Sequence, residues 1–181
     1  MGRLKQLLPW KGRTLLRHAV ETALATACRP VVIVLGSSAE LCRQEFQDLE
    51  VTAVENSKWR EGMGTSVAAG INSLLHLEPE APAALFMLVD QPALTASYLE
   101  LLLSEWERSP KSVVATRYDN AGGTPAIFPK ALFDDLRLCQ GDRGARSIIN
   151  RTGAMLLSPD TPLFDLDTPE RYSEAASGAQ L

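Results

Sequence analysis

Unbroken apolar runs constrain the fold of this chain more than any other feature of its sequence. They lie at residues 29–36 (RPVVIVLG), 83–90 (AALFMLVD), 112–118 (SVVATRY) and 154–159 (AMLLSP). A strand that is apolar at every position is buried on both faces, as in a parallel sheet covered by helices on each side. A fifth run at 49–56 (LEVTAVEN) alternates more, so we expect it to form an outer strand.

Segments with helical periodicity separate these runs. Residues 14–27 place apolar side chains at positions 15, 16, 19, 20, 23 and 24, which is helical spacing. Further helices are expected at 39–47, 66–77, 97–107, 130–138 and 145–151. Thr95 or Ser97 is expected to cap the helix at 97–107, and Pro169 to start a last helix. The alternation predicts an α/β fold: a Rossmann-like, doubly wound, mostly parallel sheet with helices on both faces.

The length of 181 residues predicts one domain, residues 1–181, because no repeat or linker-like composition interrupts the chain. The tail at 174–181 is expected to fray. A doubly wound domain normally begins with a central strand that leads into the ligand loop. This chain begins MGRLKQLLPW, which is typical of a loop that runs into a helix. We therefore expect the first strand to be absent from it.

Composition excludes several classes of protein. A formal net charge of -4 argues against a general nucleic-acid binder, although local cations could still hold a small anion. The cysteines Cys28, Cys42 and Cys139 lie far apart, which predicts reduced thiols in a cytoplasmic protein rather than disulfides or a zinc site. His18 and His76 are the only histidines and give little support to a Ser-His-Asp triad. The sequence shows no membrane-spanning run and no signal peptide.

Candidate functional residues follow the expected strands, because open α/β sheets bind ligands at the carboxyl ends of their strands. Asp90 ends the run 83–90, and an acid there is costly unless it is paired or binds a cation. It could be a Mg²⁺ ligand or a helix cap. We favour the metal ligand because the next helix begins several residues later, near Thr95.

The segment FDLDTPERY supplies two more aspartates. Asp165 and Asp167 would point the same way from an extended chain and could complete a metal site with Asp90. Asp167 or Thr168 could instead cap the helix that follows. Lys5 lies in a glycine-containing loop before a helix, where its point charge could bind a phosphate. Alternatively, it is an ordinary surface lysine.

Three glycine-containing loops are further candidates. In NSKWREGMGTS (56–66), Gly62 and Gly64 could let the backbone approach a ligand beside the free N–H groups of a helix start, or the segment is an ordinary capped loop. DNAGGTPAIFP (119–129) predicts a hairpin turn with a possible binding role. CQGDRGARSIIN (139–150) could bind an anion at a helix start. Alternatively, Asp142 caps that helix and the arginines are solvated.

Taken together, these stretches resemble the MobA-like nucleotidyltransferases. KQLLPW, VVIVLG, NSKWREGMGTS, VDQP, GGTP, GDRGAR and DLDTPE occur in that family's order and spacing, over nearly the whole chain. KQLLPW, EGMGTS and GDRGAR are most similar to the molybdenum cofactor cytidylyltransferase branch, which transfers CMP from CTP to molybdopterin with Mg²⁺. Of the family's nucleotide loop, L-A-A-G-x-S-x-R-M-G-x-x-K, only the end is present, as residues 1–5, with Leu4 in place of the usual proline.

The resemblance implies a role for each candidate. Catalytic roles fall to Lys5, which would hold the triphosphate, and Asp90. The nucleotide-binding residues would be Lys5, Asn56, Gly62, Gly64 and Ser66. The acceptor-binding residues would be Gly123, Pro125, Gly141, Asp142, Gly144 and Arg146. The metal ligands would be Asp90 with Asp165 or Asp167.

The implied cofactor is Mg²⁺, and the implied partners are CTP or GTP, molybdopterin and a molybdenum hydroxylase that receives the product, with no nucleic acid and no membrane. The acceptor phosphate would attack the α-phosphate without a general base, so catalysis would consist of alignment and charge neutralisation. Two alternatives stay open. One is a guanylyltransferase or another transferase of the family. The other is a catalytically silent protein that binds or assembles the molybdenum cofactor.

Overall fold

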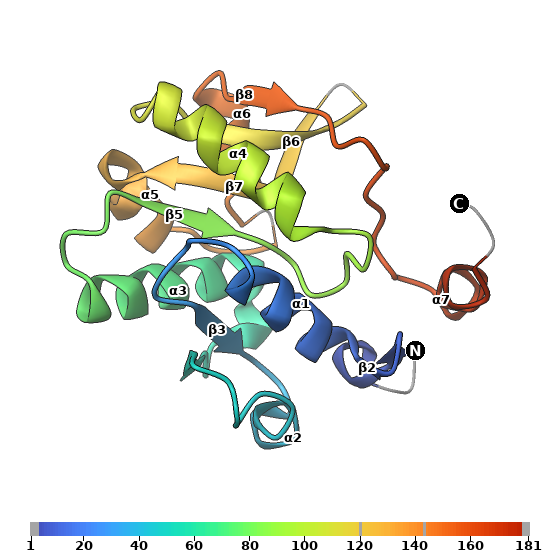
Figure 1. The fold of residues 1–181 in the computed structure, drawn as a ribbon. Helices are drawn as coiled ribbons and strands as arrows, with labels where there is room; N and C mark the ends of the chain where they lie inside the picture. The colour runs from blue at the N-terminus through green and yellow to red at the C-terminus, as the bar shows by residue number, and fades with distance from the viewer. Residues whose placement is uncertain (1–3, 120, 143, 179–181) are drawn as a thin grey trace.

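The computed structural model describes residues 4–119, 121–142 and 144–178 (Figure 1). Its larger sheet has the strand order β5 (Ala83–Phe86), β7 (Ala121–Pro129), β6 (Val114–Tyr118) and β8 (Met155–Leu157). β7 is antiparallel to both β5 and β6, and β8 is parallel to β6. The predicted α/β class is confirmed. The sheet is mixed: β5, β6 and β8 run in one direction, as predicted, and β7 runs against them.

A second, parallel pair lies beside this sheet. β3 (Val32–Leu35) pairs with β4 (Thr52–Glu55), and β4 has no second partner among the described strands, as expected for an outer strand. The earlier elements are a 3-10 turn at Lys5–Leu7 and a hairpin of β1 (Pro9–Trp10) and β2 (Arg13–Thr14), and the hairpin joins neither larger group. Among the described residues, β3 and β5 therefore each have one paired edge.

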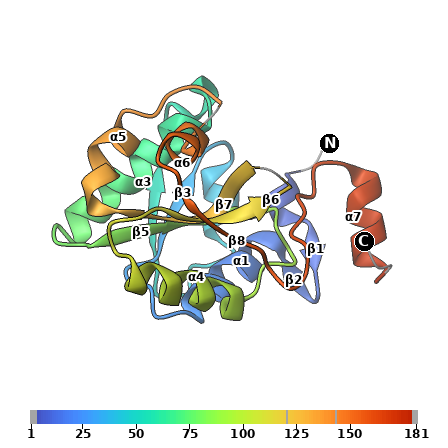
Figure 2. The ribbon, with the colours of Figure 1, turned by 90° about the horizontal axis from the view of Figure 1, so that it is seen from above.

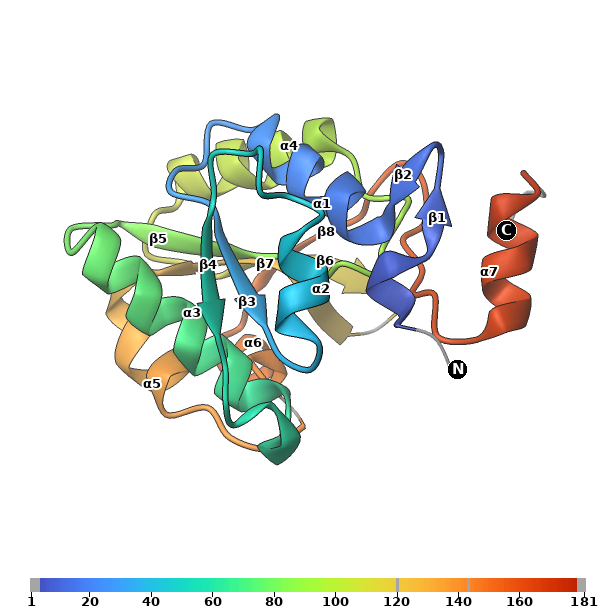
Figure 3. The same cartoon turned by 90° about the horizontal axis from the view of Figure 1, so that it is seen from below.

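Helix α3 (Met63–Leu77) packs against both groups of strands (Figure 3). Gly70 lies at this contact: a Cβ atom there would be 3.3 Å from the Val34 side chain on β3 and 3.9 Å from the Phe86 ring on β5. The missing side chain lets the helix axis approach both strands closely. One helix thus ties the two groups of strands together.

Helices cover the two faces of the sheet in separate layers (Figure 2). α1 (Leu15–Leu24) and α4 (Ala96–Arg108) lie on one side, and α3, α5 (Phe133–Arg137) and α6 (Arg146–Arg151) lie on the other. The short α2 (Ala39–Arg43) adjoins β3 and β4. α7 (Pro169–Ala176) lies beside the β1–β2 hairpin, where the Tyr172 hydroxyl donates a hydrogen bond to the main-chain oxygen of Pro9 (2.6 Å). None of the described helices is both long and apolar enough to cross a bilayer.

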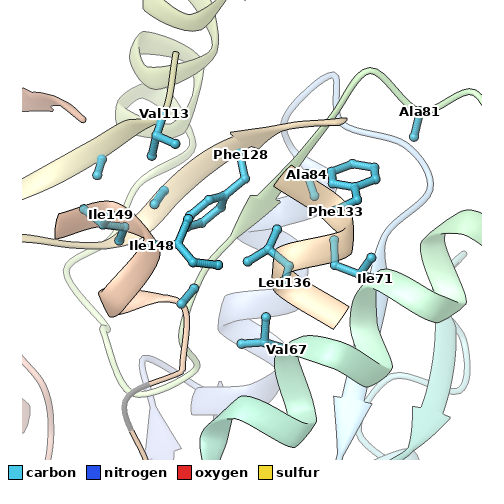
Figure 4. Close-up of a cluster of buried hydrophobic side chains, with 13 residues drawn as sticks. Val67, Ile71, Ala81, Ala84, Val113, Phe128, Phe133, Leu136, Ile148 and Ile149 are labelled. Atoms are coloured by element: carbon cyan, nitrogen blue, oxygen red, sulfur yellow. The ribbon is translucent and has the colours of Figure 1, made fainter. Parts of the chain in front are cut away.

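The apolar strand runs are buried on both sides, which is why they lack alternation. Ala84 and Phe128 face the core beneath α3, α5 and α6 (Figure 4), whereas Leu85 and Ile127 face α4. Within the first core, the Phe86 and Phe128 rings meet edge to face with their centroids 5.6 Å apart. The second core includes Tyr98, Leu99, Leu102 and Val114.

Two strand boundaries differ from the prediction. β5 ends at Phe86, four residues before Asp90. Phe86 pairs with Ala126, and the next residues of β7, Pro125 and Thr124, lie where the register of β7 with β6 shifts. Gly122 and Gly123 lie inside β7 rather than in the hairpin turn, which precedes Ala121. A Cβ atom on Gly123 would lie 2.9 Å from the ring of Tyr118, so the glycine makes room for that ring.

Of the residues expected to fray, 174–176 belong to α7, and 179–181 lie outside the described part of the chain, so the fraying stays a prediction. Thr168 caps this helix by accepting a hydrogen bond from the N–H of Arg171 (3.2 Å), and Pro169 occupies the first turn. Ala175 and Tyr172 also pack against the core around Trp10. These contacts hold the last helix to the body of the protein.

Candidate functional site

Two segments that are distant in sequence meet at Asp90. The main-chain oxygen of Asp90 accepts a hydrogen bond from the N–H of Leu166 (3.0 Å). Leu166 is completely buried with Trp10 and Leu15, which anchors the segment on either side of it. Asp165 and Asp167 flank this anchored residue, so their carboxylates are both held near Asp90.

Lys5 joins this corner from the start of the chain. Its ammonium group contacts the Asp90 carboxylate and lies 3.2 Å from Oδ1 of Asp167. Burial lowers the pKa of Lys5, but the hydrogen bond and charge of Asp90, followed by those of Asp167, outweigh burial and raise the pKa above its ordinary value. Lys5 is therefore a fixed cation at neutral pH, and three predicted site residues share one ion-pair cluster.

The donor set of this corner suits a hard divalent cation. Asp90 and Asp167 already converge on one positive group, the Lys5 ammonium, which stands where a cation would be held. No three Asp, Glu, His or Cys side chains form a ready metal cage in residues 4–119, 121–142 and 144–178. Asp165 is held separately, because its Oδ1 accepts a hydrogen bond from Gln91 (3.0 Å).

Gln91 is a residue that the sequence reasoning passed over. It is 5% exposed, and its amide nitrogen also donates to the Tyr118 hydroxyl oxygen (2.9 Å). Tyr118 in turn donates to the main-chain oxygen of Thr124 (2.6 Å). Burial raises the pKa of Tyr118; the Gln91 hydrogen bond opposes this, and the charges of the nearby carboxylates add to it. The one sequence signal for Gln91 was its place directly after Asp90 in VDQP.

A helix also supports this loop. His18 on α1 lies with Nε2 3.2 Å from the main-chain oxygen of Pro92. Burial lowers the pKa of His18, which the Pro92 oxygen partly offsets and the charges of Arg13 and Lys11 reinforce. The neutral ring therefore donates from Nε2 and ties α1 to the loop after Asp90.

Asn56 and Ser66 bond to each other rather than facing outward. Asn56 is 6% exposed, and its Nδ2 donates to Oγ1 of Thr65 (2.8 Å) and Oγ of Ser66 (3.0 Å). Its Oδ1 accepts from the N–H of Lys58 (3.0 Å). The amide thus closes the 56–66 loop from inside. Direct contact of Asn56 and Ser66 with a nucleotide stays a prediction.

The two glycine loops pack directly on each other. The N–H of Gly64 donates to the main-chain oxygen of Gly141 (2.8 Å), so this group at the start of α3 is not free for a ligand, contrary to expectation. A Cβ atom on Gly64 would lie 2.5 Å from the main-chain nitrogen of Gln140, and one on Gly62 would lie 2.6 Å from the oxygen of Gly141. The glycines permit this loop-to-loop contact, which joins the predicted nucleotide and acceptor segments.

The remaining residues predicted to bind the acceptor substrate lie in two parts of the structure. Asp142 and Arg146 are exposed near the loop contact, and Gly144 packs on Met63. Asp142 does not cap α6, whose cap at Ala145 makes no side-chain hydrogen bond, so that alternative is wrong.

Pro125 and Gly123 lie in β7 beside Tyr118, at the Gln91 end of the site, and Pro125 is fully buried. Thr95 caps α4, as predicted, by accepting from the N–H of Tyr98 (3.3 Å). The cysteines Cys28, Cys42 and Cys139 are free thiols.

Known proteins are similar to this chain over most of its length. The family described as "MobA-like NTP transferase domain" matches residues 1–156. The nicotine blue oxidoreductase of Paenarthrobacter nicotinovorans is 31% identical over 177 residues, which cover 92% of this chain and 85% of the relative. The molybdenum cofactor cytidylyltransferase of Escherichia coli is 23% identical over 185 residues, which cover 96% of this chain and 91% of the relative.

A solved structure shares the fold. Rv0371c of Mycobacterium tuberculosis, crystallised in complex with manganese, superimposes with a TM-score of 0.79 at 24% identity, over 97% of this chain and 93% of that one. At this identity the likeness concerns the fold.

Proposed function

Because the chain belongs to the MobA-like NTP transferase family, we propose that it transfers CMP from CTP to the phosphate of molybdopterin and releases pyrophosphate. The general reaction class, nucleotidyl transfer, is that of the family. One observation carries the proposal to this chain: Lys5, Asp90 and Asp167 converge at the end of the sheet where α/β proteins bind ligands. This corner combines a fixed cation with carboxylates suited to a divalent metal.

The residues account for the reaction without a general base. An oxygen of the acceptor phosphate forms a bond to the α-phosphorus, and the bond from that phosphorus to the pyrophosphate oxygen breaks. The nucleophile is already ionised, so catalysis needs alignment and stabilisation of the leaving charge. Lys5 supplies a positive group for the triphosphate. Asp90, with Asp165 or Asp167, would hold the divalent metal, which supplies further positive charge when bound.

The choice of CTP and molybdopterin is supported by the cytidylyltransferase relative and by the matching KQLLPW, EGMGTS and GDRGAR stretches. The test is pyrophosphate release by the 181-residue chain with CTP and with GTP, in the presence of molybdopterin and Mg²⁺ or Mn²⁺. We expect CTP to be preferred. Equal or reversed preference would refute the cytidylyl assignment and favour the guanylyltransferase.

Asp90→Asn tests the catalytic corner. Turnover should fall about 100-fold or more, because the variant removes a charge that fixes the metal. Asp160→Asn is the matched control, since Asp160 is an exposed acid outside the corner, and it should leave turnover unchanged. If the parent chain retains molybdopterin but turns over neither nucleotide, the silent assembly protein becomes the better description.

Oxidoreduction is the second candidate, favoured by the 31% identity to a protein named nicotine blue oxidoreductase. It is tested by following the absorbance of NADH and NADPH in the presence of an acceptor dye and the protein, without any nucleoside triphosphate. Protein-dependent oxidation of the nicotinamide that persists in Asp90→Asn would favour this activity over nucleotidyl transfer.

A further inference from the structure

We propose that Gln91 is a positioning residue: it holds Asp165 in the orientation that a divalent cation requires and links this acid to the Thr124 end of β7. The proposal rests on the proposed function only in taking Asp165 as a ligand of the metal. Gln91 bridges three parts of the chain that meet only in the folded state. Its amide nitrogen lies 3.0 Å from Oδ1 of Asp165, 2.9 Å from the Tyr118 hydroxyl and 3.4 Å from the main-chain oxygen of Thr124.

The partners determine which way the Gln91 amide points. Tyr118 donates its one hydroxyl hydrogen to the main-chain oxygen of Thr124 (2.6 Å), so its oxygen can only accept from Gln91. The Asp165 carboxylate, when ionised, also only accepts. Both neighbours therefore require the nitrogen of the amide, and its two N–H groups serve one each. This arrangement fixes the side chain and, through it, the direction of the Asp165 oxygens.

The Gln91 amide leaves one buried polar atom without a partner in the described part of the chain, which costs stability. Oε1 of Gln91 is buried and has no hydrogen-bond partner among the described residues. An unpaired buried carbonyl oxygen destabilises a fold, and an apolar side chain of the same length would avoid it. That change would also remove the N–H groups from which Tyr118 and Asp165 accept. Gln91 instead retains the N–H groups that Asp165 and Tyr118 use, which is the behaviour of a group that orients a ligand.

Gln91→Met separates positioning from folding. Met has a similar length and no N–H group, so it frees Asp165 while filling the same space. The measurement is titration of the 181-residue chain with Mn²⁺ alone, followed by the electron paramagnetic resonance signal of free Mn²⁺. We expect the dissociation constant to rise about 10- to 100-fold, as for other groups that orient metal ligands. The thermal midpoint should stay within about 5 °C of that of the parent chain, because the volume is conserved and the loss of the unpaired oxygen partly offsets the loss of the two donors.

Tyr118→Phe is the matched control. It removes the second acceptor of Gln91 but leaves the bond to Asp165, and the Thr124 oxygen lies close enough to take the freed N–H. We expect its Mn²⁺ affinity to stay within a few-fold of the parent. Asp165→Asn should weaken Mn²⁺ binding as Gln91→Met does, and combining the two should weaken it little further because both act through one carboxylate.

The proposal would be overturned if Gln91→Met bound Mn²⁺ with the affinity of the parent chain. It would also be overturned if neither the parent chain nor any variant bound Mn²⁺ saturably. Should Gln91→Met fail to fold, Asp165→Asn alone decides, because parental affinity in that variant removes Asp165 from the site. Failure of the proposed function gives a different result: intact Mn²⁺ binding that depends on Gln91, with no nucleotide turned over.

Discussion

The contact between the two glycine loops predicts a large effect of one added methyl group. Gly64→Ala would place a Cβ atom 2.5 Å from the main-chain nitrogen of Gln140, and backbone cannot rotate away as a side chain does. Forcing extra volume into such a contact costs about 1–3 kcal/mol. Moving the 139–142 loop would also break the hydrogen bond from Gly64 to Gly141, worth about 1 kcal/mol. The free energy of unfolding should therefore fall by roughly 2–4 kcal/mol.

For a chain of this length, that loss corresponds to a fall in the thermal midpoint of about 5–15 °C. The assay is thermal and urea denaturation followed by circular dichroism, with Gly70→Ala as the control in the same helix. At Gly70 the new Cβ atom would meet only side chains, Val34 at 3.3 Å and Phe86 at 3.9 Å, and the gain in helix propensity of about 1 kcal/mol offsets the crowding. If both variants change the midpoint equally, the steric argument about the loop contact is wrong.

Further predictions concern the site, the pH dependence and a helix cap. Lys5→Met should lower nucleotidyl transfer about 100-fold or more, measured by pyrophosphate release, because it removes the fixed cation. Lys11→Met, also near the start of the chain, should not, and equal losses would refute the role of Lys5. Burial lowers the pKa of His18, so the unfolded state takes up a proton at a higher pH than the folded state. Stability should accordingly fall as the pH drops below about 6.5, and less so in His18→Gln, as checked by urea denaturation across that range. An unchanged slope would show that His18 is not responsible. Thr95→Ala should cost about 1 kcal/mol through loss of the α4 cap, measured in the same way, whereas Ser97→Ala should cost much less.

Local pattern predicted most of the elements. The amphipathic spacing before residue 24, the cap at Thr95 and the start of the last helix at Pro169 depend on neighbours within a few residues, and the structure has all three. The end of β5 could not be predicted, because it coincides with an irregularity in its partner β7, at Thr124 and Pro125. The position of Gly122 and Gly123 inside β7 likewise follows from the space taken by Tyr118 and Ile149.

The candidate site divides in the same way. Asp90 was identifiable from its place after an apolar run, and the resemblance to a family pointed to Lys5 and the two later acids. That Asp167 shares Lys5 with Asp90, while Asp165 is held by Gln91, appears only when distant parts of the chain meet. Asn56 could be selected from the sequence, but its bonds to Thr65 and Ser66 depend on the path of the folded loop.

The sequence by itself therefore determined the α/β class, the layered burial of the strands and the family, because hydrophobic periodicity and motif spacing are properties of the chain read in order. Tertiary structure alone decided the antiparallel direction of β7, the closure of one glycine loop on another and the pairing of each acid in the corner around Lys5. Those features depend on which groups, far apart in the chain, compete for the same space and the same hydrogen bonds, and only the packed fold settles that competition.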